Sequence, residues 1–206
     1  MVRPQVRSRI LQLRVNKMSK YETLEIDDQG NVVWISVNRP DALNALNRTV
    51  LEELLDIGTA LADREDLDVV VVTGKGRAFV AGADIKAMLN YSSEEAQAFS
   101  ELGHNAFNAI ASLPCPVIGA LNGFALGGGL ELALACDLLY ASDKARLGRP
   151  EVSLSVIPGW GGTQRLGRRI GWHHARELVF TGKQLRAEEA KAIGLVLDIF
   201  PIEEFR

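Results

Sequence analysis

The chain has 206 residues, a length that favours one domain with a sizeable hydrophobic core. Hydrophobic residues make up 47% of the sequence, as is usual for a soluble globular protein, and the formal net charge is −3. These values give no case for binding to nucleic acid or to a membrane surface, and no apolar run is long enough to span a bilayer.

The first twenty residues differ from the rest because they carry six Lys or Arg residues and no acid. We expect residues 1–20 to be a disordered basic extension, or an upstream start with Met18 as the alternative first residue. An Arg-rich, acid-poor start is also typical of a transit peptide. The expected location is therefore the cytoplasm, or the mitochondrial matrix if the extension is a transit peptide.

The first predicted elements are a β-hairpin and an amphipathic helix. Residues 21–26 and 31–37 are β-rich, and they flank residues 27–30, Asp-Asp-Gln-Gly, which are a turn signal. Apolar residues then recur at helical spacing across residues 48–64.

The middle of the chain continues with a strand, a loop and a second helix. An apolar β-branched run at 68–73 predicts a strand buried on both faces, and the glycine-rich residues 74–82 predict a loop. Ser92 and Glu95 form a capping box for a helix that runs to about residue 113. The expected core face of this helix is Ala96, Phe99, Leu102, Ala106 and Ile110.

The stretch around which the sequence is organised is residues 122–131, Asn-Gly-Phe-Ala-Leu-Gly-Gly-Gly-Leu-Glu. It joins an apolar run at 116–121, which predicts a buried strand, to an apolar run at 130–136, which predicts a buried helix. Glycine lets backbone approach a ligand closely, and a helix start presents unpaired N–H groups. The joint therefore suits an anion or a developing oxyanion. Glu131 lies one turn further on among apolar neighbours, and a buried carboxylate needs a partner or a task.

The remaining predicted elements are a strand, three helices and a last strand. They lie at residues 137–141, 163–170, 172–180, 187–192 and 195–200. The recurrence of strand, strand and helix suggests an α/β fold with a right-handed ββα spiral, although no sequence repeat proves it.

Four segments, in order along the chain, resemble the crotonase (enoyl-CoA hydratase/isomerase) superfamily, and enoyl-CoA hydratases most of all. They are residues 38–46, 78–86, 122–137, and 148–152 with 157–165. The resemblance covers residues 21–200 and implies a crotonase-like ββα spiral core that binds acyl-CoA. Family members continue for several tens of residues in helices. We therefore expect residues 201–206 to be the start of a C-terminal helical region that is largely missing.

The resemblance also implies a catalytic site. The backbone N–H groups of Ala83 and Gly128 would form an oxyanion hole for the thioester oxygen. Glu131 and Glu151 would be the acid and base, because family members that hydrate a double bond resemble this chain in carrying glutamate at both positions. Without the resemblance, Ala83 would be an ordinary loop residue and Glu151 a surface turn residue.

Further residues match family segments that bind CoA or the acyl group. They are Ala42, Leu43, Ala81, Asp84, Ile85, Lys86, Gly127 and Trp160. Trp160 could equally pack in the core, whereas a bulky ring beside an acyl pocket would favour short acyl chains. Lys86 could meet a phosphate or be an ordinary surface lysine.

The sequence therefore predicts an enoyl-CoA hydratase that adds water to a trans-2-enoyl-CoA to give a 3-hydroxyacyl-CoA. The alternatives are an enoyl-CoA isomerase or another crotonase reaction on acyl-CoA, and a non-catalytic acyl-CoA-binding or scaffold protein. Apart from acyl-CoA, the expected partners are further copies of the chain, in a homotrimer or a dimer of trimers, if the C-terminal helices are present.

We expect no cofactor beyond the coenzyme A that the substrate carries, and no metal site. His104, His173 and His174 show no ligand spacing with acids or cysteines. Cys115 and Cys136 lie in apolar contexts, as small core residues do in a reducing compartment.

Overall fold

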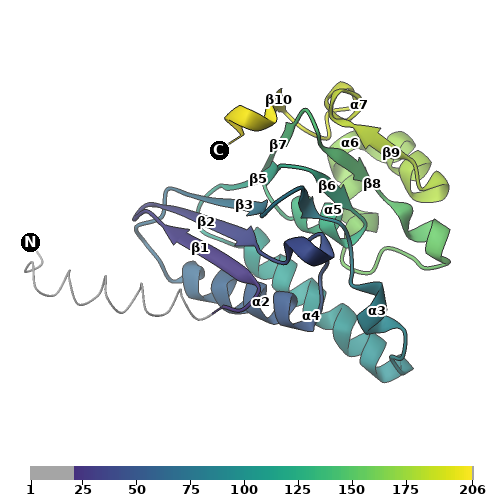
Figure 1. The fold of residues 1–206 in the computed structure, drawn as a ribbon, viewed down its shortest axis with the longest axis horizontal. Helices are drawn as coiled ribbons and strands as arrows, with labels where there is room; N and C mark the ends of the chain where they lie inside the picture. The colour runs from purple at the N-terminus through teal and green to yellow at the C-terminus, as the bar shows by residue number, and fades with distance from the viewer. Residues whose placement is uncertain (1–20, 206) are drawn as a thin grey trace, which may run out of the picture.

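A six-stranded sheet holds most of the longer strands of the fold (Figure 1). The computed structural model describes residues 21–205, and the sheet has the order β1-β2-β3-β5-β7-β10. Its strands are β1 (Leu24–Asp28), β2 (Val32–Val37), β3 (Val69–Gly74), β5 (Val117–Leu121), β7 (Leu138–Ser142) and β10 (Asp198–Phe200). Within this sheet β1 and β2 are antiparallel and all other neighbours are parallel.

A second sheet, of order β4-β6-β8-β9, consists of three-residue strands. These are β4 (Ala78–Val80), β6 (Phe124–Leu126), β8 (Arg146–Gly148) and β9 (Gln184–Arg186). Because β4, β6 and β8 follow β3, β5 and β7 in the chain, the backbone alternates between the two sheets and enters a helical segment after each pair. This alternation confirms the predicted ββα spiral.

Helices cover the sheets and carry much of the site. They are η1 (Pro40–Ala42), α2 (Arg48–Ala62), α3 (Ile85–Met88), α4 (Ser93–Ala111), α5 (Gly128–Ala133), η2 (Pro150–Leu154), α6 (Gly162–Thr181), α7 (Ala187–Ala192) and η3 (Ile202–Glu204). α2 packs against α4, and the two lie side by side below the first sheet in Figure 1. Gly58 allows this approach, because a Cβ there would lie 2.9 Å from the Cβ of Ala109.

Two of the predicted helix boundaries have the expected local cause. The Ser92 hydroxyl accepts a hydrogen bond from the Glu95 N–H at 3.2 Å, and the Glu95 carboxylate accepts one from the Ser92 N–H at 2.8 Å. This is the predicted capping box. Gly171 has φ 78° and ψ 152° inside α6, so the chain kinks where the sequence predicts two successive helices.

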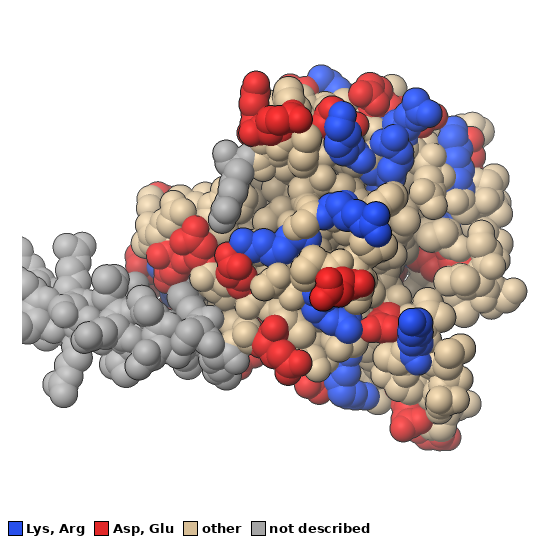
Figure 2. All heavy atoms as spheres, viewed as in Figure 1, with Lys and Arg blue, Asp and Glu red and all other residues tan. Residues whose placement is uncertain are grey.

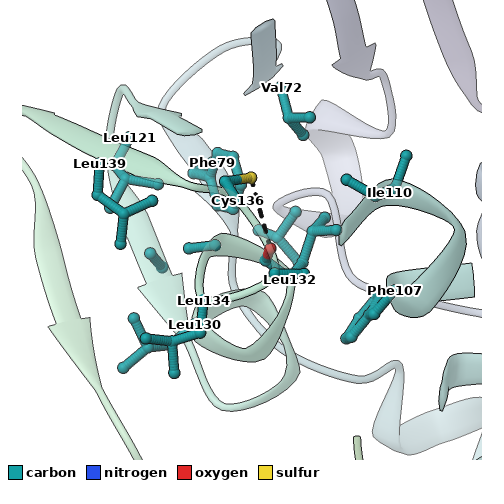
Figure 3. Close-up of a cluster of buried hydrophobic side chains, with 14 of the residues drawn as sticks. Val72, Phe79, Phe107, Ile110, Leu121, Leu130, Leu132, Leu134, Cys136 and Leu139 are labelled. Atoms are coloured by element: carbon teal, nitrogen blue, oxygen red, sulfur yellow. Dashed lines mark hydrogen bonds between the residues drawn. The ribbon is translucent and has the colours of Figure 1, made fainter. Parts of the chain in front are cut away.

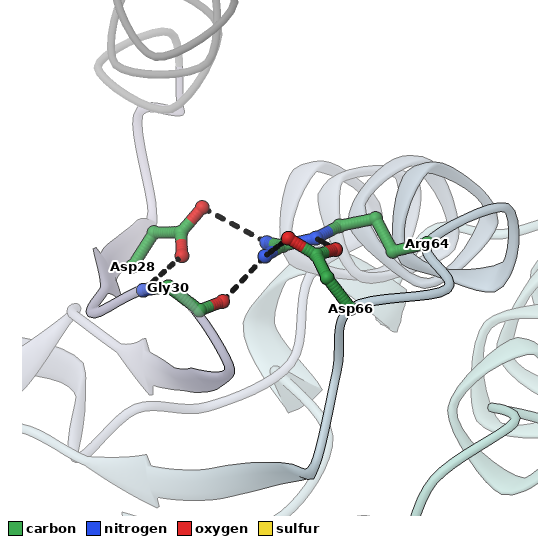
Figure 4. A network of polar contacts seen from close by, with 4 residues as sticks. All are labelled: Asp28, Gly30, Arg64 and Asp66. Carbon is green, nitrogen blue, oxygen red and sulfur yellow. Dashed lines mark hydrogen bonds and ion pairs between the residues drawn. The ribbon is translucent and has the colours of Figure 1, made fainter. Parts of the chain in front are cut away.

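Arg64, in the segment that follows α2, binds the β1–β2 hairpin (Figure 4). Its guanidinium contacts the carboxylates of Asp28 and Asp66, each at 2.9 Å, and donates to the carbonyl of Gly30. The hairpin turn is tighter than predicted, because β1 continues to Asp28. Gly30 makes the turn with φ 89°.

The hydrophobic core surrounds α5 (Figure 3). Around the leucines of this segment lie side chains from both sheets and from α4, namely Val72, Phe79, Leu121, Leu139, Phe107 and Ile110. The helix expected after the glycine joint is α5, which begins at Gly128 and ends at Ala133, with Leu134 as its C-cap. The apolar run at 130–136 is therefore helical only in its first part.

Two further predictions were wrong in detail. The segment 74–82 is not a plain loop, because β4 lies within it and pairs with β6. The core face of α4 is rotated from the expected one, since Ala96 is exposed and Leu102 half-buried. Its buried residues are Phe99, Gly103, Ala106, Phe107 and Ile110.

The surface of the described residues gives no sign of a bilayer-spanning element. No helix within residues 21–205 combines the length and apolar character that crossing a membrane requires. On the face drawn in Figure 2, acidic and basic side chains are interspersed. The expectations for residues 1–20 concern a segment outside the described part of the chain.

Candidate active site

A cavity of about 180 Å³ lies where the start of α5, the β4–α3 connection, α4 and η2 meet. Among its lining residues are eight that the sequence singles out as site residues. They are Ala81, Ala83, Ile85, Gly127, Gly128, Glu131, Glu151 and Trp160. The fold thus brings together segments that are up to 79 positions apart in the chain, from Ala81 to Trp160.

The glycine joint places backbone directly at this cavity. Gly127 is the N-cap of α5 and has φ 51° with ψ −121°, a conformation that side chains with a Cβ disfavour. Gly128 lies against Trp160, because a Cβ at this position would be 2.4 Å from the Trp160 ring. All six residues of α5 are buried.

Backbone hydrogen bonds fix the chain on both sides of Ala83. The Leu46 N–H donates to the Gly82 carbonyl at 2.8 Å, and the Asp84 N–H donates to the Leu46 carbonyl at 2.9 Å. Ala83 therefore pairs with Leu46 as an isolated parallel bridge. This pairing leaves the Ala83 N–H pointing away from Leu46.

The N–H groups of Ala83 and Gly128 have no hydrogen-bond acceptor within residues 21–205. Their loops are adjacent, since a Cβ on Gly127 would lie 4.0 Å from the Cα of Gly82. Both residues line the cavity, so both N–H groups are available to a ligand that binds there. Two such donors are what an oxyanion hole uses.

Glu131 is buried, with 2% of the residue exposed, and its carboxylate is held by backbone. Its Oε1 accepts hydrogen bonds from the N–H groups of Trp160, at 2.9 Å, and Gly162, at 2.7 Å. Both donors lie just before or at the start of α6. Such donors stabilise a negative charge on the carboxylate.

Glu151 lies in η2 and has a different environment. Its side chain is 12% exposed, and both carboxyl oxygens are buried. Within residues 21–205 neither oxygen accepts a well-aligned hydrogen bond, although Oε1 is in an ion pair with Arg149. Burial raises the pKa of the Glu151 carboxyl, Arg149 opposes that shift, and Glu131 adds to it. Glu151 is therefore not the surface turn residue that its Pro-Glu context alone would favour.

Arg149 is a site residue that the sequence analysis missed. It is completely buried, and its Nη2 lies 3.2 Å from Glu131 and 2.6 Å from Glu151 in ion pairs. Its Nη1 donates to the Gly127 carbonyl at 2.9 Å. The only signal in the sequence is a basic residue two positions before Glu151, and the contact with Glu131 depends on the fold.

Trp160 both packs in the core and lines the cavity. Only 4% of it is exposed, and its ring meets Phe99 and Phe107 edge to face with centroids 5.2 and 5.7 Å apart. Gly103 of α4 gives the ring its space, because a Cβ there would lie 2.2 Å from the indole nitrogen. The ring thus closes one end of the cavity.

Four of the sequence-selected residues do not line the cavity: Ala42, Leu43, Asp84 and Lys86. Leu43, next to Ala42, lies close to it, because its carbonyl accepts the Ala81 N–H at 3.1 Å. Asp84 caps α3 and pairs with Arg39 at 3.1 Å. Lys86 is exposed. Their expected contacts with CoA stay predictions.

Neither a metal cluster nor a reactive thiol is present at the cavity. Within residues 21–205 no group of three or more His, Cys, Asp or Glu side chains is arranged to hold a metal ion. Cys115 and Cys136 are free and buried, as expected for core residues. Burial raises the pKa of the Cys136 thiol to about 12, which keeps it protonated at neutral pH.

Comparison with known proteins shows the family of this chain. Residues 27–206 match the enoyl-CoA hydratase/isomerase family. A crotonyl-CoA hydratase from Syntrophomonas wolfei is 44% identical over 185 residues, which are 89% of this chain and 71% of that protein. A short-chain-enoyl-CoA hydratase from Clostridium acetobutylicum is 45% identical over 172 residues, 83% of this chain and 66% of the relative.

The fold also matches solved structures. A crystal structure of an enoyl-CoA hydratase from Bacillus anthracis superposes with a TM-score of 0.86 at 42% identity. The match covers 89% of this chain and 72% of the other.

Proposed function

Because this chain belongs to the enoyl-CoA hydratase/isomerase family, we propose that it adds water across the double bond of a trans-2-enoyl-CoA. The product is a 3-hydroxyacyl-CoA. The observation that carries the proposal is the pairing of two carboxyl groups in unlike environments, Glu131 and Glu151, at a cavity lined by two free backbone N–H groups. Relatives that are named as crotonyl-CoA and short-chain-enoyl-CoA hydratases support the same reaction.

The thioester oxygen binds at the N–H groups of Ala83 and Gly128 in this proposal. As the new C–O bond forms at C3, the electrons of the double bond move towards C2 and the thioester oxygen gains negative charge. Donors that are already aimed at that oxygen stabilise the charge without reorganisation, and one such donor is typically worth about 2.7–4 kcal/mol of barrier.

The two glutamates divide the proton transfers. Glu131, whose Oε1 accepts two backbone N–H bonds and faces Arg149, is the carboxylate that takes a proton from the attacking water. Glu151, whose pKa is raised by burial, is the acid that gives a proton to C2. One proton leaves water, one reaches C2, and the water oxygen joins C3, so the atoms balance. Proton exchange with solvent then resets the pair.

The test is hydration of crotonyl-CoA, followed by loss of the enoyl absorbance. Glu131→Gln and Glu151→Gln each keep the size of the side chain but lose the group that takes up or gives a proton, so each should lower kcat by about 10²–10⁴-fold. The double variant should be little worse than either single one, because groups that act as a unit are not additive. Glu65→Gln, at an exposed position, is the matched control and should keep full activity.

The assay also separates the alternatives. If Glu131→Gln hydrates normally while Glu151→Gln loses conversion of 3-enoyl-CoA to 2-enoyl-CoA, an isomerase replaces the hydratase. If the wild-type chain binds acyl-CoA but turns over neither substrate, a non-catalytic acyl-CoA-binding protein replaces both.

A further inference from the structure

We infer that Arg149 is a positioning residue that orients both halves of the site, the acid/base pair and the oxyanion donor at Gly128. The inference rests on the proposed function and deepens it. Arg149 acts through other groups, because its own side chain is completely buried and does not line the cavity.

The first half of the argument concerns one peptide plane. The carbonyl of Gly127 and the N–H of Gly128 belong to the same planar trans peptide, so they point in opposite directions. Arg149 donates to that carbonyl at 2.9 Å, and the Glu131 N–H donates to it at 3.0 Å. These two bonds hold the carbonyl on the protein side and thereby aim the Gly128 N–H at the cavity.

The second half concerns charge. The same nitrogen of Arg149 lies beside Glu131 and Glu151, and arginine stays protonated in proteins. Two buried carboxylates that share a site without a cation cannot readily both be ionised, and they repel each other. The guanidinium between them keeps the two groups together and opposes the rise in the pKa of Glu151.

Few other charged groups face this cluster. Arg165 of α6 acts on Glu131 through space, but its own hydrogen bonds go to the Trp160 carbonyl at 2.9 Å and to Asn108 at 2.7 Å. Gly162 leaves room for the guanidinium, because a Cβ there would lie 2.5 Å from the Arg149 Nη2. A buried ion pair contributes little net stability compared with an apolar replacement. Stability alone therefore gives no reason for an arginine at this position.

The activity test compares Arg149→Gln with Arg149→Lys. Arg149→Gln should lower kcat for crotonyl-CoA by about 10²-fold, the typical cost of a small misplacement at a site, with KM little changed. Loss of the cation raises the pKa of the Glu151 acid, so the alkaline limb of the rate profile should move to higher pH. Arg149→Lys keeps the charge and loses the planar fork, so kcat should fall while the limb stays in place.

Arg169→Gln is the control, because Arg169 is a half-buried arginine that also binds backbone carbonyls, but beyond the other end of α5. It donates to the carbonyls of Asp137, at 2.9 Å, and Cys136, at 2.6 Å. Its loss should lower stability and leave the alkaline limb where it is. A limb that moves equally in Arg169→Gln and Arg149→Gln would overturn the inference.

A second measurement does not depend on turnover. In Arg149→Gln the folded-state pKa of Glu151 rises further above its unfolded value, so its contribution to stability is full at low pH and is lost as pH rises through the folded pKa. The stability difference between wild type and Arg149→Gln, measured by urea unfolding, should therefore be constant at low pH and grow as pH rises through the folded-state pKa of Glu151. Adding Glu151→Gln should remove that pH dependence, whereas Arg169→Gln should show a constant difference.

The outcomes are distinguishable from those of the proposed function. If the wild-type chain does not hydrate crotonyl-CoA, the proposed hydratase function is wrong. The unfolding measurement still decides whether Arg149 controls the charge of Glu151. The inference is overturned if Arg149→Gln has the kcat of wild type, the alkaline limb of wild type and the same dependence of stability on pH. If Arg149→Gln does not fold, Arg149→Lys with unchanged kcat would overturn it equally.

Discussion

At the scale of single residues, the site shows how one side-chain type acquires two chemical characters. Glu131 is held by backbone donors from the segment that begins α6, whereas the oxygens of Glu151 have no such donors and are buried beside one guanidinium. Environment and not residue type separates an acid from a base. The N–H groups of Ala83 and Gly128 make the same point, because any residue has an N–H and only its place in the fold brings it to the cavity without an acceptor.

Those two donors can be tested without changing a side chain. Replacing the Ala83 amide by an ester, with lactic acid in place of alanine, removes the N–H and adds no atoms. We expect kcat to fall about 10²–10³-fold in a crotonyl-CoA assay, because one oxyanion donor is lost. Gly128→Pro or Gly128→Ala is a poorer test, since a Cβ there would meet the Trp160 ring at 2.4 Å.

The control for this replacement is an ester at Ala87, whose N–H is bound within the cap of α3. It should lower stability slightly and leave kcat unchanged. An Ala83 ester with full kcat would show that this N–H does not meet the thioester oxygen.

At the scale of elements, α4, α5 and the segment before α6 are interlocked by one indole ring. Trp160 fits between Gly103 of α4 and Gly128 of α5, and its backbone N–H holds Glu131. Moving the ring therefore also moves a bond to the Glu131 carboxylate. We expect the packing of the two helices and the position of this carboxylate to change together.

Gly103→Ala tests this coupling. The added Cβ would lie 2.2 Å from the Trp160 indole nitrogen, and overpacking of this kind typically costs about 1–3 kcal/mol of unfolding free energy. We expect that loss together with a lower kcat. Trp160→Phe in the same chain should recover part of the stability by making room for the methyl group.

Gly159→Ala is the matched control, because a Cβ at Gly159 would meet nothing within 4 Å. Its unfolding free energy should stay within about 0.5 kcal/mol of wild type. If Gly103→Ala loses stability but keeps wild-type kcat, the ring and the carboxylate are not coupled.

At the scale of the whole molecule, the cavity is formed by segments from both halves of the spiral. β4–α3 and α4 supply one wall, and α5, η2 and the segment before α6 supply the other. A ligand that binds there contacts elements far apart in sequence, so its binding free energy should oppose global unfolding. Assembly into a homotrimer or a dimer of trimers stays a prediction, which sedimentation tests.

Butyryl-CoA, which has no double bond to hydrate, provides the corresponding measurement. At a hundred times its Kd a ligand stabilises the folded state by about 2.7 kcal/mol. For a domain of this size that corresponds to a rise in Tm of about 5–11 °C. Glu131→Gln should keep the rise, because the carboxyl meets the reacting carbons and not the CoA. An unchanged Tm with butyryl-CoA would contradict acyl-CoA binding at this cavity.

Long, periodic segments of this fold could be predicted from sequence, whereas short strands could not. Ser92 indicates the start of α4 in the sequence, and the residues on either side of Gly171 are predicted as two helical segments. The strands of the second sheet have three residues each, which is too few to show the alternation of apolar and polar residues in the sequence. They form because the fold brings them beside one another as pairing partners.

The site divides in the same way. The apolar neighbours of Glu131 indicate its burial, because they are adjacent in sequence. Glu151 could be selected only through a family resemblance. Arg149 could not be selected as a site residue, because its role depends on its contacts with Glu131 and Gly127, which precede it by 18 and 22 positions.

The packing of Trp160 has an optical consequence. The chain contains three tryptophans, of which Trp34 is half-buried in β2 and Trp172 is exposed on α6. Trp160 alone is both enclosed by aromatic rings and in contact with the cavity. Its indole emits from an apolar surrounding, so its fluorescence lies to the blue of that of Trp172. In a Trp34→Phe, Trp172→Phe chain the remaining emission becomes a built-in signal for occupancy of the cavity, without any attached dye.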